Sequence, residues 1–225
     1  MQMTAVQGRL RVASPGEADQ VLAFYQANSH HFLLPRPETE FEKAVQRGNF
    51  FLVEIGDRLL AVSGIFDYAD DLPYVEFAET SVAPEVRGYG IQALFFRHRI
   101  GSVVISQGPG VTMTTAVNPG NTHSIENTRR IGFQTWSQPI HEAYASCPRC
   151  PSKPTPDVGR PCCCDFYCLP TPKAREAVST LLQETESGIL NLQRKGSGLL
   201  LRSECLFLTG EYRRMLDDFV QGQVW

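Results

Sequence analysis

The chain has 225 residues, 42% of them hydrophobic, which is enough to bury a substantial core. Its formal net charge is −3 and it has no long basic run, so nucleic acid is not expected as a partner. Its apolar runs are shorter than the roughly 20 residues of a membrane span, and its N-terminal segment lacks the order of a secretion signal. We therefore expect a soluble, cytoplasmic protein with no membrane partner.

Segments with strand and helix patterns alternate along the chain. The predicted strands cover residues 8–14, the two arms of a hairpin within 49–68 that turns at Gly56-Asp57, then 74–83, 110–117, 133–146, 166–170 and 198–208. The predicted helices cover residues 15–29 (with Ser14 as N-cap), 38–48, 90–108, 121–132, 171–188 and 210–222. This alternation favours an α/β or α+β fold with a mixed sheet.

A glycine-containing loop, Arg87-Gly-Tyr-Gly90, lies where the strand at 74–83 ends and the helix at 90–108 begins. The first turn of a helix has unpaired N–H groups and a partial positive charge. Gly88 and Gly90 permit unusual backbone angles and let a ligand approach the main chain, while Arg87 adds a positive charge. The loop therefore suits a pyrophosphate. The alternative is a helix start that merely needs small residues.

Two stretches resemble the GNAT superfamily of N-acetyltransferases. The first, VAPEVRGYG (82–90), resembles the acyl-CoA pyrophosphate loop of that superfamily. The second, NPGNTHSIENTRRIGF (118–133), resembles a later helix, with Asn121, Ser124, Gly132 and Phe133 at the matching positions. The resemblance implies the GNAT fold, whose sheet is mixed but mostly antiparallel and flanked by helices. It also implies a V-shaped split between the strands at 73–83 and 111–117.

The resemblance implies acetyl-CoA as co-substrate, held by three groups of residues. Pyrophosphate would bind the backbone N–H groups of Arg87, Gly88, Tyr89, Gly90, Ile91 and Gln92. The backbone of Ser81 and Val82 would pair with the pantetheine like an added strand, and Asn121 and Ser124 would contact the cofactor. The superfamily usually carries Gly or Ala where this chain has Gln92. The longer side chain should crowd the phosphates or point away from them.

The implied reaction is the transfer of an acetyl group to a primary amine by direct attack, which requires a base and a proton for the departing thiolate. Glu76 falls where histone acetyltransferases of the superfamily carry their base; Glu79 and water are the alternatives. Because side chains alternate along a strand, Glu76 and Glu79 are expected on opposite faces. The alternative to a catalytic role, for either residue, is a solvated charge at the edge of the sheet. Thr128 stands where many members carry a Tyr that acts as the general acid. The group that protonates the thiolate could therefore be water, Tyr144 or Tyr167, or there is no such group.

Six of the seven cysteines lie between positions 147 and 168, a pattern more typical of a metal site than of disulfides in a reducing compartment. We expect this segment to form a hairpin insert whose tip holds a structural zinc ion. The predicted ligands are Cys147, Cys150, Cys162 and Cys164. Disulfides, free thiols, or a ligand set that includes Cys163 or Cys168 are the alternatives.

We expect residues 1–170, with the insert 147–168, to form the acyltransferase domain. Residues 171–225 are expected to form a helix-strand-helix extension packed on it. The expected acceptor is a small-molecule or peptide amine, and the chain is expected to form a homodimer. A second hypothesis, motivated by Gln92 and Thr128, is an acyl-CoA-binding sensor or docking module with little or no turnover.

Overall fold

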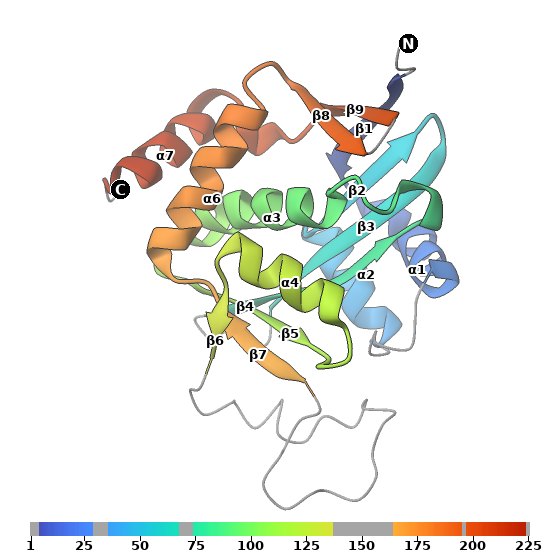
Figure 1. Cartoon of the computed structure of the whole chain (residues 1–225), viewed down its shortest axis with the longest axis horizontal. Helices are drawn as coiled ribbons and strands as arrows, with labels where there is room; N and C mark the ends of the chain where they lie inside the picture. Colours follow the sequence, from blue (N-terminus) through green and yellow to red (C-terminus); the bar gives the residue numbers. More distant parts are fainter. Residues whose placement is uncertain (1–4, 29–35, 68–73, 137–163, 195–196, 224–225) are drawn as a thin grey trace, which may run out of the picture.

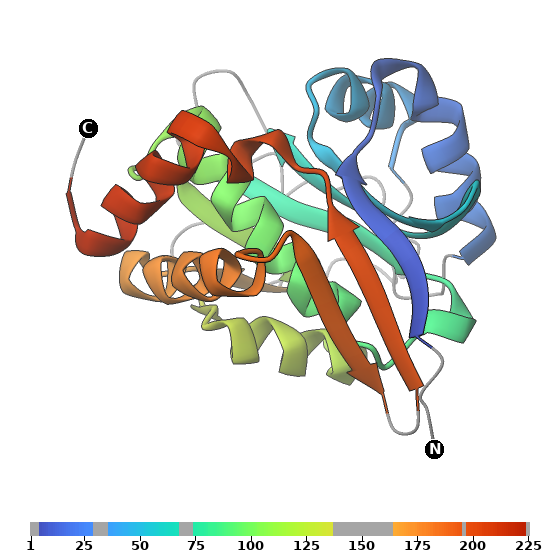
Figure 2. The same cartoon turned by 90° about the horizontal axis from the view of Figure 1, so that it is seen from above.

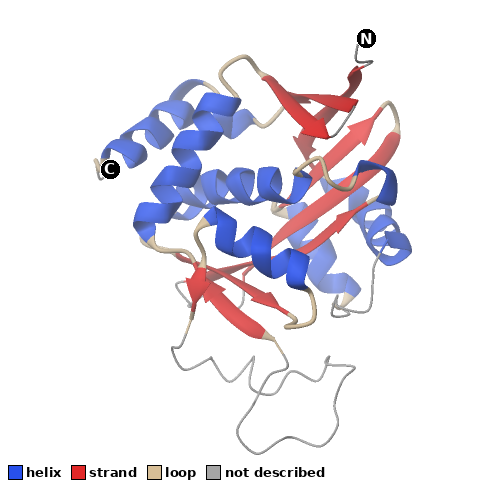
Figure 3. Ribbon diagram, in the orientation of Figure 1, coloured by secondary structure: helices blue, strands red, loops and turns tan. Residues whose placement is uncertain are grey.

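The structure, a computed structural model, describes residues 5–28, 36–67, 74–136, 164–194 and 197–223. One twisted sheet runs through the molecule, and helices cover both of its faces (Figures 1 and 3). The strands are β1 (Ala5–Val12), β2 (Phe50–Ile55), β3 (Arg58–Asp67), β4 (Tyr74–Val82), β5 (Thr112–Val117), β6 (Gln134–Thr135), β7 (Asp165–Cys168), β8 (Ile189–Arg194) and β9 (Ser197–Ser203). The helices are α1 (Ala18–Asn28), α2 (Glu38–Gln46), α3 (Ile91–Gln107), α4 (Thr122–Ile131), α6 (Thr171–Glu184) and α7 (Gly210–Gln221). Short 3-10 turns lie at Pro15–Glu17, Pro84–Val86 and Leu206–Leu208.

The strand order in the sheet is β6-β7-β5-β4-β3-β2-β1-β9-β8. Two neighbouring pairs, β4 with β5 and β1 with β9, are parallel. The other pairs are antiparallel. The expectation of a mixed, mostly antiparallel sheet flanked by helices is confirmed.

Local sequence signals explain several element ends. The backbone N–H of Ser14 donates to the Glu17 carboxylate at 2.6 Å, which is half of a capping box, so the first helical turn starts where predicted. Gly48, with φ of 70°, ends the segment of α2. The β2–β3 hairpin turns at Gly56-Asp57, also as predicted.

Two predictions differ from the structure at the strand level. The long strand expected at 133–146 is short within the described residues, where β6 covers only Gln134–Thr135, and the rest of that range lies outside them. Strand β8, at Ile189–Arg194, was not predicted at all. Its alternation is interrupted by polar residues, and only Leu190 on it is fully buried. The late strand, predicted to reach 208, ends at Ser203 and gives way to a 3-10 turn.

Each face of the sheet packs against its own core. On one face, α1 and α2 cover a cluster that contains Tyr25, Phe41, Phe50 and Phe66. On the other face α3 lies across the sheet, with Phe95 and Phe96 buried as predicted. Figure 2 shows α6 and α7 beyond α3 on this second face. Among the helices in the described ranges, none has both the length and the apolar character needed to cross a membrane.

The C-terminal elements share the second core. A Cβ on Gly101 of α3 would lie 2.8 Å from Leu181 of α6 and 3.2 Å from Phe207, so the helices approach closely at this glycine. Cys205, predicted as a packed core thiol, is buried here, and burial raises its pKa to about 12. Beyond these helices, β9 pairs with β1 along Ala5–Leu10, so the extension continues the sheet.

Candidate functional site

Strands β4 and β5 meet at one end and separate at the other. Their register pairs Tyr74 with Thr112, Val75 with Met113 and Glu76 with Thr114, and no later pair is formed. Beyond that point the Thr115 hydroxyl donates to the Phe77 carbonyl at 2.8 Å, so the contact between the two strands there is made by a side chain and not by the backbone of β5. The edge of β4 from Phe77 to Val82 therefore has no strand partner on its β5 side in the described part of the chain. This is the V-shaped split that the sequence predicted.

The split leads to the loop at the start of α3. Gly88 and Gly90 have φ angles of 85° and 82°, in the left-handed region that favours glycine, and Gly90 is the N-cap of α3. Among the described residues, no backbone acceptor pairs with the N–H groups of Gly88, Tyr89 or Gly90. The loop and the first helical turn thus present consecutive donors to one place, as an anion site requires.

The predicted cofactor residues next to this loop differ in the contacts they make within the protein. Arg87 Nε donates to the Val82 carbonyl at 3.0 Å, so its side chain folds back along the end of β4. Ser81 is buried, and its hydroxyl has no hydrogen-bond partner among the described residues. Ser81 and Val82 pair with β3 on one side only, through Val62 and Ala61. Their other edge faces the split.

Helix α4 lies beside the loop and is tied to it by Gln92. The Gln92 amide donates to Ser124 Oγ at 3.2 Å and accepts from Asn127 Nδ2 at 2.7 Å. Asn121 caps α4, accepting from the Ser124 N–H at 3.2 Å. The Gln92 side chain therefore points toward Ser124 and Asn127 of α4. At the position where the superfamily usually carries Gly or Ala, this chain has a side chain that links α3 to α4 by hydrogen bonds.

A β-bulge in β4 changes the direction of the two predicted catalytic carboxylates. The register with β3 shifts between Val62 and Gly64, and Glu79 has φ of 54°, the only positive φ of a non-glycine residue in the described ranges. A bulge adds a residue and breaks the alternation of faces. The expectation that Glu76 and Glu79 point to opposite faces is therefore wrong, because both carboxylates reach the same guanidinium.

That guanidinium belongs to Arg36, just before α2. Arg36 Nη2 donates to Glu76 at 2.8 Å and its Nε donates to Glu79 at 2.8 Å. Its other terminal nitrogen donates to Glu40 at 3.0 Å. The exposed fractions of Glu76 and Glu79 are 4% and 7%, so neither is a solvated edge charge. Burial raises the pKa of Glu76, and Arg36 opposes this rise.

Two aromatic side chains complete the surroundings of this pair. The Arg36 guanidinium lies 3.9 Å from the centre of the Phe66 ring, a cation–π contact. Tyr25 of α1 is buried and hydrogen-bonds Glu79; burial, followed by the charge of Glu79, raises its pKa. Three carboxylates thus share one arginine at the face of β4 that α1 and α2 cover. Sequence analysis did not point to Arg36, because Glu76 and Glu79 lie 40 and 43 positions away from it.

A second buried arginine holds the bulge from the opposite face. Arg99 of α3 is fully buried between the rings of Phe77 and Phe96, at 4.8 and 4.6 Å from their centres. Its Nη1 donates to the carbonyls of Gly64 and Ala78, at 3.1 and 3.5 Å. Burial lowers the pKa of Arg99 to about 9. Arg99 thus binds two carbonyls of a cross-strand pair next to the bulge, which sequence analysis did not foresee.

A cavity of about 330 Å³ lies on the outer side of the Arg87–Gly90 loop. Tyr89, Glu85, Arg58 and Gly198 line it, so it separates the loop from the β2–β3 turn and from β9. It does not extend into the split between β4 and β5.

Comparison with known proteins was informative only at the level of structure. No protein-family model and no curated protein sequence matches the chain. N-acetylglutamate synthase from Neisseria gonorrhoeae, solved with coenzyme A and N-acetyl-glutamate, superposes with a TM-score of 0.53 at 18% identity, over 72% of this chain and 34% of that one. The chain thus spans about a third of the synthase. Rv2747 from Mycobacterium tuberculosis, solved with CoA, superposes with a TM-score of 0.50 at 15% identity, over 71% of this chain and 97% of that one.

The chain has the GNAT fold. In this fold, Thr128 of α4 stands at the position for which the sequence resemblance implied an acidic Tyr. Thr128 is fully buried, and its hydroxyl has no hydrogen-bond partner among the described residues. Tyr167, another residue considered as acid, is buried in β7. Tyr144 lies outside the described residues.

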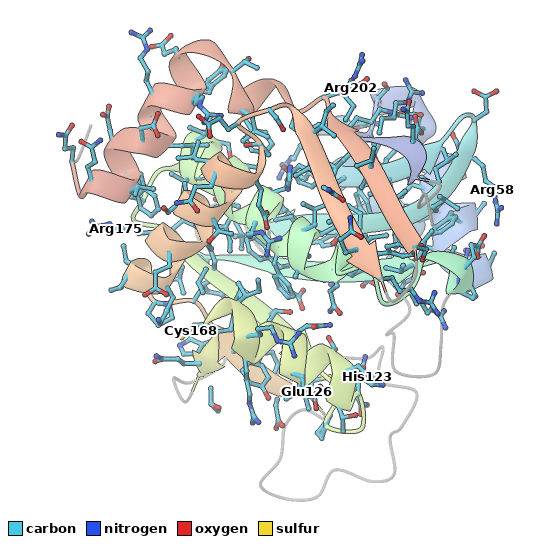
Figure 4. The ribbon with its side chains drawn as sticks, turned by 45° about the horizontal axis from the view of Figure 1, so that its top comes forward. Arg58, His123, Glu126, Cys168, Arg175 and Arg202 are labelled. Atoms are coloured by element: carbon cyan, nitrogen blue, oxygen red, sulfur yellow. The ribbon has the colours of Figure 1, made fainter. Side chains whose placement is uncertain are left out.

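The cysteine segment, which the sequence predicts to be an insert, is described by the structure only in part. Of the predicted zinc ligands, Cys147, Cys150 and Cys162 lie outside the described residues, as does Cys163. Cys164 is buried before β7, and Cys168 ends β7 (Figure 4). Within the described ranges no group of three or more His, Cys, Asp or Glu residues could hold a metal ion. Zinc has no support here and stays a prediction.

Proposed function

We propose that this protein is an acyl-CoA-dependent N-acyltransferase that transfers an acetyl group from acetyl-CoA to a primary amine. The observation that carries the proposal is the split between β4 and β5 that ends at the unpaired N–H groups of Gly88, Tyr89 and Gly90. An extended pantetheine can pair with the free edge of β4 at Ser81 and Val82, as a peptide adds to a sheet. The pyrophosphate then falls at the start of α3.

The carboxylates at the bulge supply the base. In the proposed reaction the amine nitrogen attacks the thioester carbonyl carbon, the C–N bond forms and the C–S bond breaks. The amine proton passes to the carboxylate of Glu76, directly or through one water. CoA leaves as the thiolate and takes a proton from solvent. Burial favours this role for Glu76, because the raised pKa brings a carboxylate closer to the operating pH of a base.

The structural neighbours support an amine acceptor of small size. The gonococcal synthase was solved with coenzyme A and N-acetyl-glutamate, so that protein binds an N-acetylated amino acid. In this chain the acceptor side carries Glu40, Glu76 and Glu79 around one arginine. Amino acids and other primary amines are therefore the first acceptors to test, followed by peptide N-termini.

The test separates charge at the loop from backbone strain. Gly90→Asp and Gly90→Asn place side chains of one shape at the same left-handed position, and only Asp brings a negative charge to the phosphates. Acetyl-CoA at 100 times its dissociation constant should stabilise the wild type and Gly90→Asn by about 2.7 kcal/mol. Gly90→Asp should bind at least about ten-fold more weakly than Gly90→Asn, although an acidic N-cap favours the helix itself.

Turnover is then measured as thiol release from acetyl-CoA over a panel of primary amines. Amine-dependent release that Gly90→Asp loses and Gly90→Asn keeps is the expected result. Equal binding by Asp and Asn variants would show that the loop does not hold the phosphates. If the protein binds acetyl-CoA but no amine of the panel causes thiol release, the result would favour an acyl-CoA-binding module over an enzyme.

A further inference from the structure

The hairpin of β8 and β9 carries an arginine to the predicted phosphate loop. On β8 the side chains of Leu190 and Leu192 face the core that contains α3. Arg194 is the next residue on that same face, because side chains two apart on a strand share a face. It lies where the hairpin passes beyond the core, paired across the strands with Ser197. Figures 1 and 2 both show this end of β8 beside the start of α3.

Three contacts join this end of the hairpin to the loop. A Cβ on Gly88 would lie 3.6 Å from both Cδ and Nε of Arg194, so the arginine side chain rests directly against the glycine. The guanidinium carbon is 5.9 Å from the centre of the Tyr89 ring. Tyr89 in turn donates a 2.6 Å hydrogen bond to Ser197 Oγ, across 108 positions of sequence. The hairpin is therefore held at the loop by both of its strands.

The charge of Arg194 is available at this place. Its side chain is exposed, and among the described residues no carboxylate forms an ion pair with it. Arg87, the cation within the loop itself, directs its Nε to the Val82 carbonyl and runs along β4. Arg58, across the neighbouring cavity, is paired with Glu85. Arg194 is thus an arginine that lies against Gly88 and Tyr89 of the loop without an acidic partner in the described ranges.

We propose that Arg194 is a phosphate-binding residue of the acyl-CoA site, supplied by the C-terminal hairpin. This inference rests on the proposed function. A guanidinium next to a row of backbone N–H donors adds a charge-assisted, two-pronged contact to a phosphate that the backbone alone holds by neutral donors. The phosphate is either the pyrophosphate or the 3′-phosphate of the CoA, and the same chemistry serves both.

The experiment compares Arg194→Gln, Arg194→Lys and Arg202→Gln with the wild type by titration with acetyl-CoA. Arg202 is a matched control, since it is an exposed arginine of the same hairpin that pairs with Ile189 at the end far from the loop (Figure 4). Arg194→Gln should lower the affinity for acetyl-CoA about ten-fold or more, and Arg194→Lys should keep most of that affinity. Arg202→Gln should bind like the wild type. Melting temperatures of all variants report whether each is folded.

A second titration with 3′-dephospho-CoA, against CoA, locates the contact. A loss in Arg194→Gln that is equal for both ligands supports contact with the pyrophosphate. A loss for CoA alone supports contact with the 3′-phosphate. Wild-type affinity in folded Arg194→Gln overturns the inference and leaves the proposed function standing. Failure of the wild type to bind acetyl-CoA at all overturns the proposed function, and the inference with it.

Discussion

Glu76 and Glu79 accept hydrogen bonds from one guanidinium although three positions separate them on a strand. The bulge at Glu79 makes this possible, and Arg99 on the opposite face binds the carbonyls of Gly64 and Ala78, the strand pair next to it. The arrangement of the two carboxylates on β4 therefore depends on two arginines, one on each side of the sheet. One neutralises the carboxylates, and the other supports the backbone that turns them together.

The first prediction concerns the base. Glu76→Gln should lower kcat/KM by about 100-fold or more, because the amine proton loses its acceptor, while acetyl-CoA affinity is kept. Glu79→Gln, which changes the neighbouring carboxylate in the same way, is the matched control and should have the smaller effect. Steady-state kinetics with the best amine of the panel measure both. The reverse order would assign the base to Glu79, and full activity in both variants would assign it to water.

The second prediction concerns Arg36. Arg36→Met removes the cation shared by Glu76 and Glu79, so two buried carboxylates lose their partner. The free energy of unfolding should fall by about 3–5 kcal/mol near pH 7, measured by urea titration. The loss should shrink as the pH falls, because the unpaired carboxylates then protonate in the folded state.

A triple variant checks the cause of that loss. Arg36→Met/Glu76→Gln/Glu79→Gln contains no buried charge at this place and should recover most of the stability. A triple variant as unstable as Arg36→Met alone would show that Arg36 contributes by packing, through its contact with Phe66, rather than by charge.

The third prediction concerns Thr128, whose hydroxyl is buried without a partner in the described structure. Thr128→Val keeps the shape and removes an unsatisfied group, so stability should rise by up to about 1 kcal/mol and kcat should be unchanged. Thr128→Ala, which leaves a void, should instead be less stable. A fall of ten-fold or more in kcat for folded Thr128→Val would mean that this hydroxyl protonates the thiolate.

The fourth prediction is a dependence of stability on pH that comes from His98 of α3. Burial lowers the pKa of His98 to about 4, from 6.5, and its Nδ1 donates to the Leu94 carbonyl. Between pH 6.5 and 4 the unfolded chain binds a proton that the folded chain does not, so stability falls as the pH falls through this range. The full contribution is about 3 kcal/mol.

Two histidine variants test this pH dependence. His98→Leu should flatten the curve of unfolding free energy between pH 6.5 and 5, above the ordinary pKa values of Asp and Glu. His123→Gln, on the exposed surface of α4, should leave the curve unchanged (Figure 4). An equally steep curve in His98→Leu would place the titrating group elsewhere.

Much of the fold could be predicted because its signals are local. The loop 87–90, the cap at Asn121, the turn at Gly56 and the pattern of α3 each depend on residues close together in sequence. The bulge could not be predicted, because nothing in the residues around Glu79 requires a left-handed conformation there. Its support comes from Arg99, about twenty positions later.

The remaining differences have the same origin. Arg36 meets its carboxylates, and Arg194 meets Gly88, only after distant strands have paired. Strand β8 has a weak pattern of its own and is stabilised by pairing with β9. Long-range partners therefore decide the parts of the candidate site that single-sequence patterns miss.

The parallel pairing of β1 with β9 has a consequence for how the protein is made. Ala5 pairs with Gly198, so β1 pairs with a strand that is synthesised much later than itself. Until then β1 is an uncovered edge of the growing sheet, open to pairing with other chains. The hairpin that closes this edge is also the one that brings Arg194 to the loop. One folding step therefore covers the edge of β1 and completes the proposed phosphate site.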